Sequence, residues 1–370
     1  MAQTLITPSI VAKEALLQLE NNTVMSNLVH RAYSEEFQKV GATVTIRRPA
    51  TFVATAVASG STVAVQEVVE GSVQVVLNKL LDTSVEITTR ELSLNIVSFS
   101  EQVVRPIMIG FAEAVDNLLT ALYVDIAGHT DVSSTPAAAD IANLRAQLNI
   151  QKVPFAERRC VLHPVTDARY VPLDSFMHAD KRAKALTINE AWLGRILGLD
   201  FYVDQNIATH TSGIADTAGA MDGAATAGAT AATVDGLADA EVIAAGDVFK
   251  VADNDRGYLV VTGGTVATNE QVITFTPPAS GIFADGAVVT FQATHDASLA
   301  FHKNAFALVT APLAPPLGGA SYAVESYKGL SCRAVFDYDI TTKKNQLSID
   351  MLCGVKTLDK ELSARLCDAL

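Results

Sequence analysis

Three successive stretches decide the fold: GATVTIRRPATF (residues 41–52), VQEVVEGSVQVVLNKLLDTSVEITTREL (65–92) and SFSEQVVRPIMIGFAEAVDNLLTALYVDIAG (98–128). In the first two, β-branched residues alternate with polar ones and glycines punctuate the pattern, which predicts a two- or three-stranded ribbon. Phe52 is the only aromatic residue between positions 41 and 94. Because a ribbon with so few large side chains is marginal alone, we expect another surface to cover it.

The third stretch predicts a long amphipathic helix. Apolar residues recur at three- and four-residue steps from Val103 to Ile126, and about 26 helical residues make a rod on the order of 40 Å long. Pro106 lacks the amide hydrogen that a helix interior uses, so the regular helix begins near Pro106 or bends there. The predicted core face consists of Ile107, Phe111, Val115, Leu118 and Leu122.

Two helical patterns precede the ribbon. Thr7 is a suitable N-cap and Pro8 fits the first helical position, where its missing N–H costs nothing. A second, shorter pattern runs from Val24 to Tyr33. Both are too short to build a core, so we interpret them as an arm.

The segment after the long helix alternates between helix and strand. A helix is predicted from Pro136 to Leu148, and strands from Arg159 to Leu162 and from Phe201 to Val203. A further helix is predicted to start near Thr187 and to carry Trp192, Leu193 and Ile196.

Residues 213–294 differ in composition from their surroundings. The run DTAGAMDGAATAGATAATVDGLADAE (residues 216–241) has almost no large side chains, whereas short β patterns with Gly or Pro turns follow it. We interpret this segment as a small all-β insertion with mobile edges. Closing strands are predicted at Ala305–Thr310, Leu330–Ile340 and Gln346–Leu358.

Bulk properties exclude several classes of protein. The 370 residues carry a formal charge of -13, which argues against sequence-specific or non-specific binding to nucleic acid through clustered cations. The four cysteines form no CxxC pair and the first residues lack the pattern of a signal peptide, so we expect reduced thiols and no secretion. The long helix carries Arg105, Glu113, Asp116 and Asp125, so we expect no membrane span.

No catalytic motif stands out, and we expect no enzyme activity, cofactor or metal. Cys160 and His163 could form a nucleophile and base, but a buried thiol and a loop histidine are the simpler interpretation. The Asp253–Asp255 turn is weakly similar to a cation loop, although a polar hairpin turn explains it better. His295 and His302 lack a third ligand.

The charges of the ribbon attract more interest. Arg47 and Arg48 precede Pro49 in the first part of the ribbon, and Glu67 and Glu70 lie further along it. A solvated ribbon face and a set of contacts to neighbouring subunits are about equally good interpretations. In the second case such charges set register and association rate.

The chain as a whole resembles the major capsid (coat) proteins of tailed double-stranded DNA phages, in particular the short-tailed-phage coat family with an inserted β domain. The resemblance rests on the three stretches above. It also rests on RRCVLHPVTDARYVPL (158–173), AGDVFKV (245–251), QVITFTPP (271–278), LAFHKNAFALVTAPL (299–313) and YDITTKKNQLSIDMLCGVKTLDKEL (338–362).

The resemblance implies an α+β capsid fold in six parts. They are an N-terminal arm (1–40), an extended β loop (41–95), a spine helix (96–130), a first part of the peripheral/axial core (131–212), an inserted β-barrel-like domain (213–296) and a second core part (297–370).

The implied function is scaffold-guided self-assembly into an icosahedral shell that encloses packaged DNA. Hexamers and pentamers of the chain itself, a scaffolding protein, a portal protein and a decoration protein are the implied partners. Assembly would occur in the host cytoplasm, and the product would be the virion capsid. The alternative is the shell subunit of an encapsulin-type compartment, which has the same fold.

Overall fold

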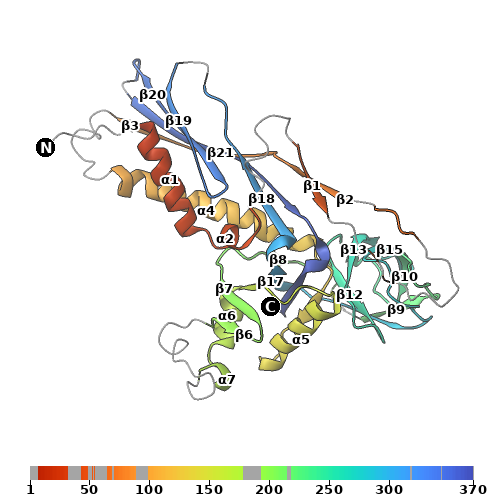
Figure 1. Ribbon diagram of the computed structural model, residues 1–370. Helices are drawn as coiled ribbons and strands as arrows, with labels where there is room; N and C mark the ends of the chain where they lie inside the picture. The colour runs from red at the N-terminus through yellow and green to blue at the C-terminus, as the bar shows by residue number, and fades with distance from the viewer. Residues whose placement is uncertain are drawn as a thin grey trace. The chain divides into compact units, whose positions relative to one another are not determined.

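The computed structural model contains both helices and sheets, which confirms the predicted mixed class, and its chain divides into two compact units (Figure 1). The first unit comprises Met1–Leu17, Arg31–Ile107 and Leu308–Lys356; the second comprises Gln18–His30, Met108–Ala307 and Thr357–Leu370. The structure describes residues 7–31, 43–48, 52, 54, 65–68, 71–88, 99–177, 193–214, 218–316, 319–342 and 344–369.

A five-stranded sheet forms the body of the first unit. Its path runs β18–β21–β20–β19, and β3 also pairs with β21. The ladders between β19 and β20, β20 and β21, and β21 and β3 are antiparallel. The strands are β3 (Lys79–Thr88), β18 (Phe306–Ala311), β19 (Ser321–Tyr327), β20 (Leu330–Asp339) and β21 (Lys344–Thr357).

The N-terminal helix α1 (Pro8–Asn22) packs on this sheet. The Cys332 thiol of β20 lies 3.5 Å from the carbonyl oxygen of Ala12, and the Ser9 hydroxyl donates to Glu325 of β19 at 2.7 Å. The side chains that alternate along β20 and β21 on the helix side are buried, as period-two strands require when one face is covered. They include Ala334, Leu347, Ile349 and Met351.

A separate ribbon consists of β1 (Thr43–Arg48) and β2 (Gly71–Val76), paired antiparallel. Val44 faces Val75 across the ladder, and both are buried. Of the two predicted forms of the ribbon, with two or three strands, the structure shows the two-stranded one. β3 leaves the ribbon and pairs with β21 over ten residues, from Lys79↔Cys353 to Thr88↔Lys344. β21 offers β3 a ladder of ten residue pairs, whereas β1 and β2 have only six residues each.

The long helix changes type along its length. Ser100–Val104 (η2) is π-helical, Arg105–Thr120 (α4) is α-helical and Ala121–Asp125 (η3) is a 3₁₀ helix. Pro106 follows directly after the change from π to α spacing. Since proline cannot donate a backbone hydrogen bond, the ladder must lose a bond here, and the helix changes type at that point.

The run Ser100–Asp125 is long and apolar enough to cross a membrane by length and composition alone. Half of its most apolar window is buried inside the protein. A helix that packs in a protein core has the same properties, so this segment is no specific sign of a membrane.

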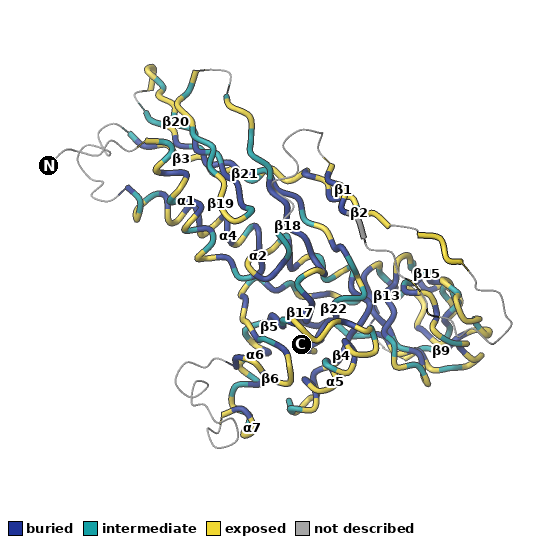
Figure 2. Tube along the Cα trace, in the orientation of Figure 1, coloured by how far each residue is buried: buried dark blue, intermediate teal, exposed yellow. Residues whose placement is uncertain are grey.

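A seven-stranded sheet forms the core of the second unit. Its path runs β4–β22–β17–β5–β7–β6, and β8 also pairs with β17. The central strand β17 is buried along its whole length (Figure 2). The strands are β4 (His129–Asp131), β5 (Arg158–Leu162), β6 (Arg195–Ile196), β7 (Leu199–Val203), β8 (Thr209–His210), β17 (His295–His302) and β22 (Ser363–Ala369).

Short helices accompany this sheet. Ile141, Leu144 and Leu148 of α5 are fully buried in one cluster with residues of β5, β7 and β22. This apolar stripe at three- and four-residue spacing explains why α5 packs against the sheet. The helices are α2 (Met25–Leu28), α5 (Ala138–Ile150), α6 (Pro164–Tyr170), α7 (Asp174–Met177), η4 (Lys303–Ala305) and η5 (Lys360–Leu362).

The prediction of a helix that starts near Thr187 and carries Ile196 is wrong at the C-terminal end of that helix. Thr187 and Trp192 lie outside the described residues, but Ile196 belongs to a β-hairpin in which it pairs with Leu199. Leu197 and Gly198 connect the strands, with φ of 49° and 87°. Two positive φ values in a row form the tight turn that matches strand twist, and they cannot continue a helix.

A closed barrel occupies residues 218–291 of the second unit, in the strand order β10–β15–β13–β12–β16–β9 (Figure 1). Its interior is aromatic: the Tyr258 and Phe275 rings lie 5.5 Å apart between centroids, and each lies 5.3–5.9 Å from the rings of both Phe249 and Phe283. Strands β11 (Val242–Ile243) and β14 (Gly264–Thr265) pair separately. The barrel strands are β9 (Ala218–Asp222), β10 (Ala231–Asp235), β12 (Val248–Val251), β13 (Tyr258–Thr262), β15 (Glu270–Thr276) and β16 (Val288–Phe291).

The alanine- and glycine-rich run forms regular strands where the structure describes it, and the mobility of its edges stays a prediction. This run supplies β9 and β10, which pair with each other and close the barrel. Val234 and Met221 are buried, while the alanines around them let the strands approach closely; a Cβ on Gly219 would lie 2.9 Å from the Asp235 carbonyl oxygen. Small side chains therefore serve close packing here.

Phe275 gives a direct test of the barrel core. We expect Phe275→Ala to lower the free energy of unfolding of the barrel by about 3–5 kcal/mol, because it removes a buried ring that contacts three others. Hydrogen exchange of the barrel strands measures this change. Val272→Ala on the same strand, where the side chain is 59% exposed, should change it by less than about 0.5 kcal/mol. Equal effects of the two variants would contradict the packing described.

Candidate assembly surfaces

The ribbon of β1 and β2 has one buried and one exposed face. Thr45 and Gln74 lie opposite each other on the exposed face, and Val76 beside them is 45% exposed. Arg47 and Arg48 end β1 opposite the first two residues of β2; their side chains lie outside the described residues. The ribbon thus presents a mostly polar outer surface close to the two arginines.

A short segment without regular secondary structure, residues 65–68, precedes β2. Val65 and Val68 are 95% and 67% exposed, and Glu67 between them is exposed as well. Glu70 lies outside the described residues. Exposed valines beside a charge are typical of a surface that another chain covers. The pairing of Arg47, Arg48, Glu67 and Glu70 with a neighbouring subunit stays a prediction.

A charge cluster links β3, β21 and β20. Asp82 and Asp350 are direct partners in the ladder, and the Ser348 hydroxyl lies 2.7 Å from an oxygen of each. Arg333 donates from Nε to Asp350 at 2.9 Å and also from Nη2. Two carboxyl groups that face each other across a ladder repel unless a proton or a cation separates them.

The pKa values of the two carboxyl groups shift in opposite directions. The hydrogen bond with Asp350, and then burial, raise the pKa of Asp82. Burial would raise the pKa of Asp350, but hydrogen bonds from Asp82, Ser348 and Arg333 outweigh it and keep that pKa below its ordinary value. Asp82 is therefore the member of the pair that holds the proton.

We expect Asp82→Asn to stabilise the first unit at pH 7.5 by about 0.5–1 kcal/mol, since it removes the like-charge repulsion and keeps a donor for Asp350. A raised pKa means that the folded state prefers the protonated acid, so the gain should disappear near pH 4, where Asp82 carries its proton. Urea unfolding at the two pH values measures it. Glu86→Gln breaks the 2.9 Å contact with Lys344 on the same two strands and should give no gain; a gain in both variants would point to a general charge effect.

The predicted core face of the long helix is only partly buried. Ile107, Phe111 and Val115 are buried to 6%, 2% and 0% exposure, whereas Leu118 and Leu122 are half-buried. The described buried stripe also contains Val104, Met108, Ala112, Asp116, Leu119 and Thr120. Toward the C-terminal end of the helix, the buried face therefore contains Asp116, Leu119 and Thr120, and the predicted Leu118 and Leu122 lie at its edge.

Asp116 is a functional candidate that sequence reasoning missed. Its carboxyl accepts from the amide of Val24 at 2.8 Å and from that of Ser26 at 3.3 Å, so it joins α4 to the first turn of α2. Burial raises its pKa to about 7 against these hydrogen bonds. A single acid within the apolar stripe of the helix was the available signal, because a buried carboxyl needs partners.

The wild type and Asp116→Asn should differ in pH dependence. The folded state prefers protonated Asp116, so its contribution to stability is present at low pH and is lost as pH rises toward 7. The stability of the wild type relative to the variant should fall by about 2 kcal/mol between pH 5.5 and pH 8. Chemical unfolding at both pH values measures this. Glu113→Gln, on the exposed side of the same helix, should leave the pH profile unchanged; a parallel profile for Asp116→Asn would refute the assignment.

The thiols show no sign of activation. Burial raises the pKa of Cys332 to about 12 and that of Cys353 to about 11, and it also raises the pKa of Cys160 and Cys367. His163 lies 3.0 Å from Asp296 and begins α6 as its N-cap. A buried neutral thiol and a histidine that caps a helix correspond to the simpler interpretation.

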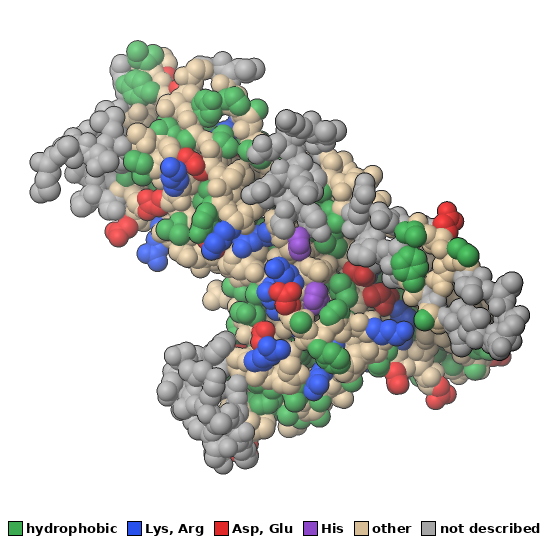
Figure 3. Space-filling model, viewed as in Figure 1, with side chains coloured by type: hydrophobic (Ala, Val, Ile, Leu, Met, Phe, Trp, Pro, Cys, Tyr) green, Lys and Arg blue, Asp and Glu red, His purple; other side chains and the backbone are tan. Residues whose placement is uncertain are grey.

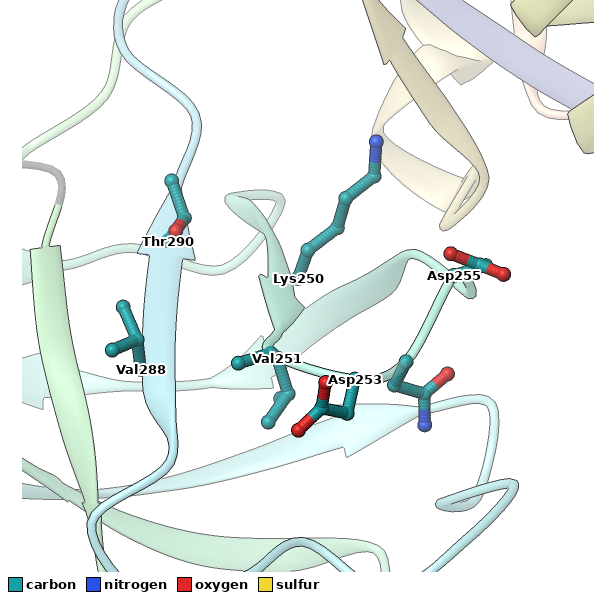
Figure 4. A pocket seen from close by; sticks show the side chains of 8 residues that line it. Lys250, Val251, Asp253, Asp255, Val288 and Thr290 are labelled. Carbon is teal, nitrogen blue, oxygen red and sulfur yellow. The ribbon is translucent and has the colours of Figure 1, made fainter.

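The Asp253–Asp255 turn lines a cleft of about 420 Å³ together with Lys250, Val288 and Thr290 (Figure 4). Figure 4 shows Asp253 and Asp255 pointing away from each other. Asn254 donates to Tyr258 and Ser280 at 2.9 and 3.0 Å. These contacts are those of a polar turn; within the described part of the chain, no three His, Cys, Asp or Glu residues gather as they would around a metal.

On the face shown in Figure 3, acidic and basic side chains are interspersed rather than separated. His295 and His302 occupy the two ends of β17, and the His302 ring accepts from the amide of Asn304. These two histidines therefore have separate surroundings and do not share a site.

Sequence comparison gives no relative: no known family matches the chain, and no curated protein does. Comparison of structures, in contrast, finds similar proteins. A chain of Mycobacterium phage Che8 is similar with a TM-score of 0.52 and 14% identity over 93% of this chain and 90% of that one. The capsid of Ralstonia phage GP4 is similar with a TM-score of 0.52 and 9% identity over 93% of this chain and 89% of that one. The chain thus has the fold of a tailed-phage capsid protein.

Proposed function

We propose that this chain is the subunit of an icosahedral shell that encloses packaged double-stranded DNA. The observation that carries the proposal is the fold shared with the capsid of phage GP4 over 93% of the chain. At 9% identity this likeness concerns the fold, so the function rests on the surfaces as well.

The ribbon supplies the second line of support. A two-stranded ribbon with exposed valines nearby is marginal in water, and covering by a neighbouring copy would stabilise it. Repetition of such a contact between identical subunits closes rings, and hexamers and pentamers of the chain are the rings that an icosahedral shell requires. We propose that Arg47, Arg48, Glu67 and Glu70 set the register of that contact.

The net charge of -13 fits a container for DNA that is loaded by force. A subunit with this net charge does not gather phosphate backbones by general attraction, so we propose that a motor drives the DNA in. A scaffolding protein to guide curvature, a portal protein for entry and a decoration protein outside complete the proposed set of partners. Assembly in the host cytoplasm and residence in the virion capsid follow from this function.

Electron microscopy of the purified full-length chain tests the proposal. We expect closed shells or polymers tens of nanometres wide, either from the chain alone or after co-expression with its scaffolding protein. A stable monomer at high concentration under both conditions would refute self-assembly. Shells that hold an enzyme instead of being competent to receive DNA would favour the encapsulin-type alternative.

Charge reversal tests the ribbon separately. We expect Arg47→Glu to reduce shell yield at least tenfold, because one reversed pair per contact is repeated across the whole shell. The circular dichroism of the unassembled subunit should stay unchanged. Glu67→Lys should impair assembly likewise, and partial rescue in the double variant would identify a direct pair. Loss of the folded subunit in Arg47→Glu would show that the arginine serves folding instead.

A further inference from the structure

The barrel is joined to the core sheet at one point of the chain path. β8 leads out of the sheet and β17 leads back, and His210 and His295 are direct partners in the ladder between them. Beyond this pair the amide of Ser212 donates to the Thr294 hydroxyl at 3.1 Å. Both chain crossings therefore lie side by side, which is the geometry of a hinge with a single axis.

The contacts across this joint are mainly polar. His210 Nε2 lies 2.8 Å from a carboxylate oxygen of Asp247 on the barrel. Arg365 of β22 donates to the carbonyl oxygen of Gly246 at 3.1 Å. Arg256 of the barrel binds both carboxylate oxygens of Glu361 at 2.7 Å. Among the described residues, a small cluster of Ala127, Val248 and Leu259 adds an apolar contribution, whereas the barrel interior has a large cluster of its own.

Three histidines and an arginine meet inside the joint. The His210 and His295 rings lie 5.3 Å apart, and Tyr123 contacts His210 at 5.6 Å between centroids. The Arg365 guanidinium lies 5.0 Å from the centre of the Tyr123 ring. His129 lies against Gly257 of the barrel, where a Cβ would come within 2.7 Å of its Nδ1. His129, His295 and Arg365 are almost completely buried.

The charged and titratable groups around these histidines come from every element that packs at the joint. They are Tyr123 and Asp125 of η3, His129 of β4, His210 of β8, Asp247 and Lys250 of the barrel, His295 of β17, and Arg365 and Cys367 of β22. Lys250 and Arg365 face His129, and Arg365 faces His295, so a proton on either histidine adds a cation beside existing ones.

The buried surroundings oppose protonation. Burial lowers the pKa of His129 to about 3 and that of His295 to about 4, and Arg365 adds to both effects. His295 Nδ1 lies 2.6 Å from the Ala293 carbonyl oxygen, which fixes the proton there. Within the described residues Nε2 has no hydrogen-bond partner, so no acceptor awaits a second proton.

We propose that this joint is an acid-operated hinge: protonation of His129 and His295 releases the barrel from the core sheet while both remain folded. In the closed joint the two histidines must be neutral, and in the open joint water solvates them as cations. The closed joint is fully favoured above pH 6.5 and loses this advantage as pH falls toward the lowered values. The aromatic core of the barrel contains no histidine among its described residues and keeps its stability.

Hydrogen exchange of the full-length, unassembled chain at pH 7.5 and pH 5.5 tests the hinge. After correction for intrinsic exchange rates, opening at the joint should increase about tenfold for each of the two histidines, and so about a hundredfold together. The segments that report it are 244–248, 256–257 and 293–297. Amides of β13 and β15 inside the barrel, and of β5 and β7 in the sheet, should stay protected.

The double variant His129→Asn and His295→Asn removes the titration and retains a donor near the Ala127 and Ala293 carbonyl oxygens. Its joint should open to the same extent at both pH values. If the double variant does not fold, His295→Asn alone should reduce the acid response to about tenfold. His302→Asn is the matched control, since His302 is also buried but lies at the far end of β17, and it should respond as the wild type does.

Two results would overturn the proposal. One is joint opening that rises equally with acid in the wild type and in the histidine variants. The other is loss of protection in the barrel and the joint together, because that would be global unfolding and not movement at a hinge.

Discussion

The pairing of β3 with β21 is the interaction on which the first unit depends. It joins two strands that lie far apart in the chain: Asp82 of β3 and Ser348 of β21 are separated by 266 positions. The pairing adds β3 to the edge of the sheet on which α1 packs, and β3 follows the ribbon directly in the chain. Such long-range pairing carries a large loop-closure cost, which the burial of Leu347, Ile349 and Met351 offsets.

Local periodicity revealed much of the fold before the structure did. The strands β1, β2, β5 and β7 and the helices α1, α4 and α5 lie close to where the sequence patterns predicted them. β22 was missed because Arg365 and Asp368 interrupt its apolar pattern, although both side chains are buried. A charge that is buried and paired is invisible to a hydropathy pattern, since the partner lies elsewhere in the chain.

The same limit applies to the candidate surfaces. Charges on the ribbon could be read from Arg47 and Glu67 directly, because exposed residues need no partner to be noticed. Asp116 was detectable as an acid within an apolar stripe, but its link to Val24 required coordinates. The opposition of Asp82 and Asp350, and the meeting of His210 with His295, arise only from strand register, which composition does not determine.

The adjacency of β8 and β17 has a consequence for the history of this protein. Because the chain leaves and re-enters the sheet at neighbouring rungs of one ladder, the ends of residues 213–294 lie about one strand spacing apart. A gene could acquire or lose this module in a single event, and a tight turn would suffice to close the sheet again. The same position can accept foreign domains, so the fold offers a natural site for displaying a passenger protein on every subunit.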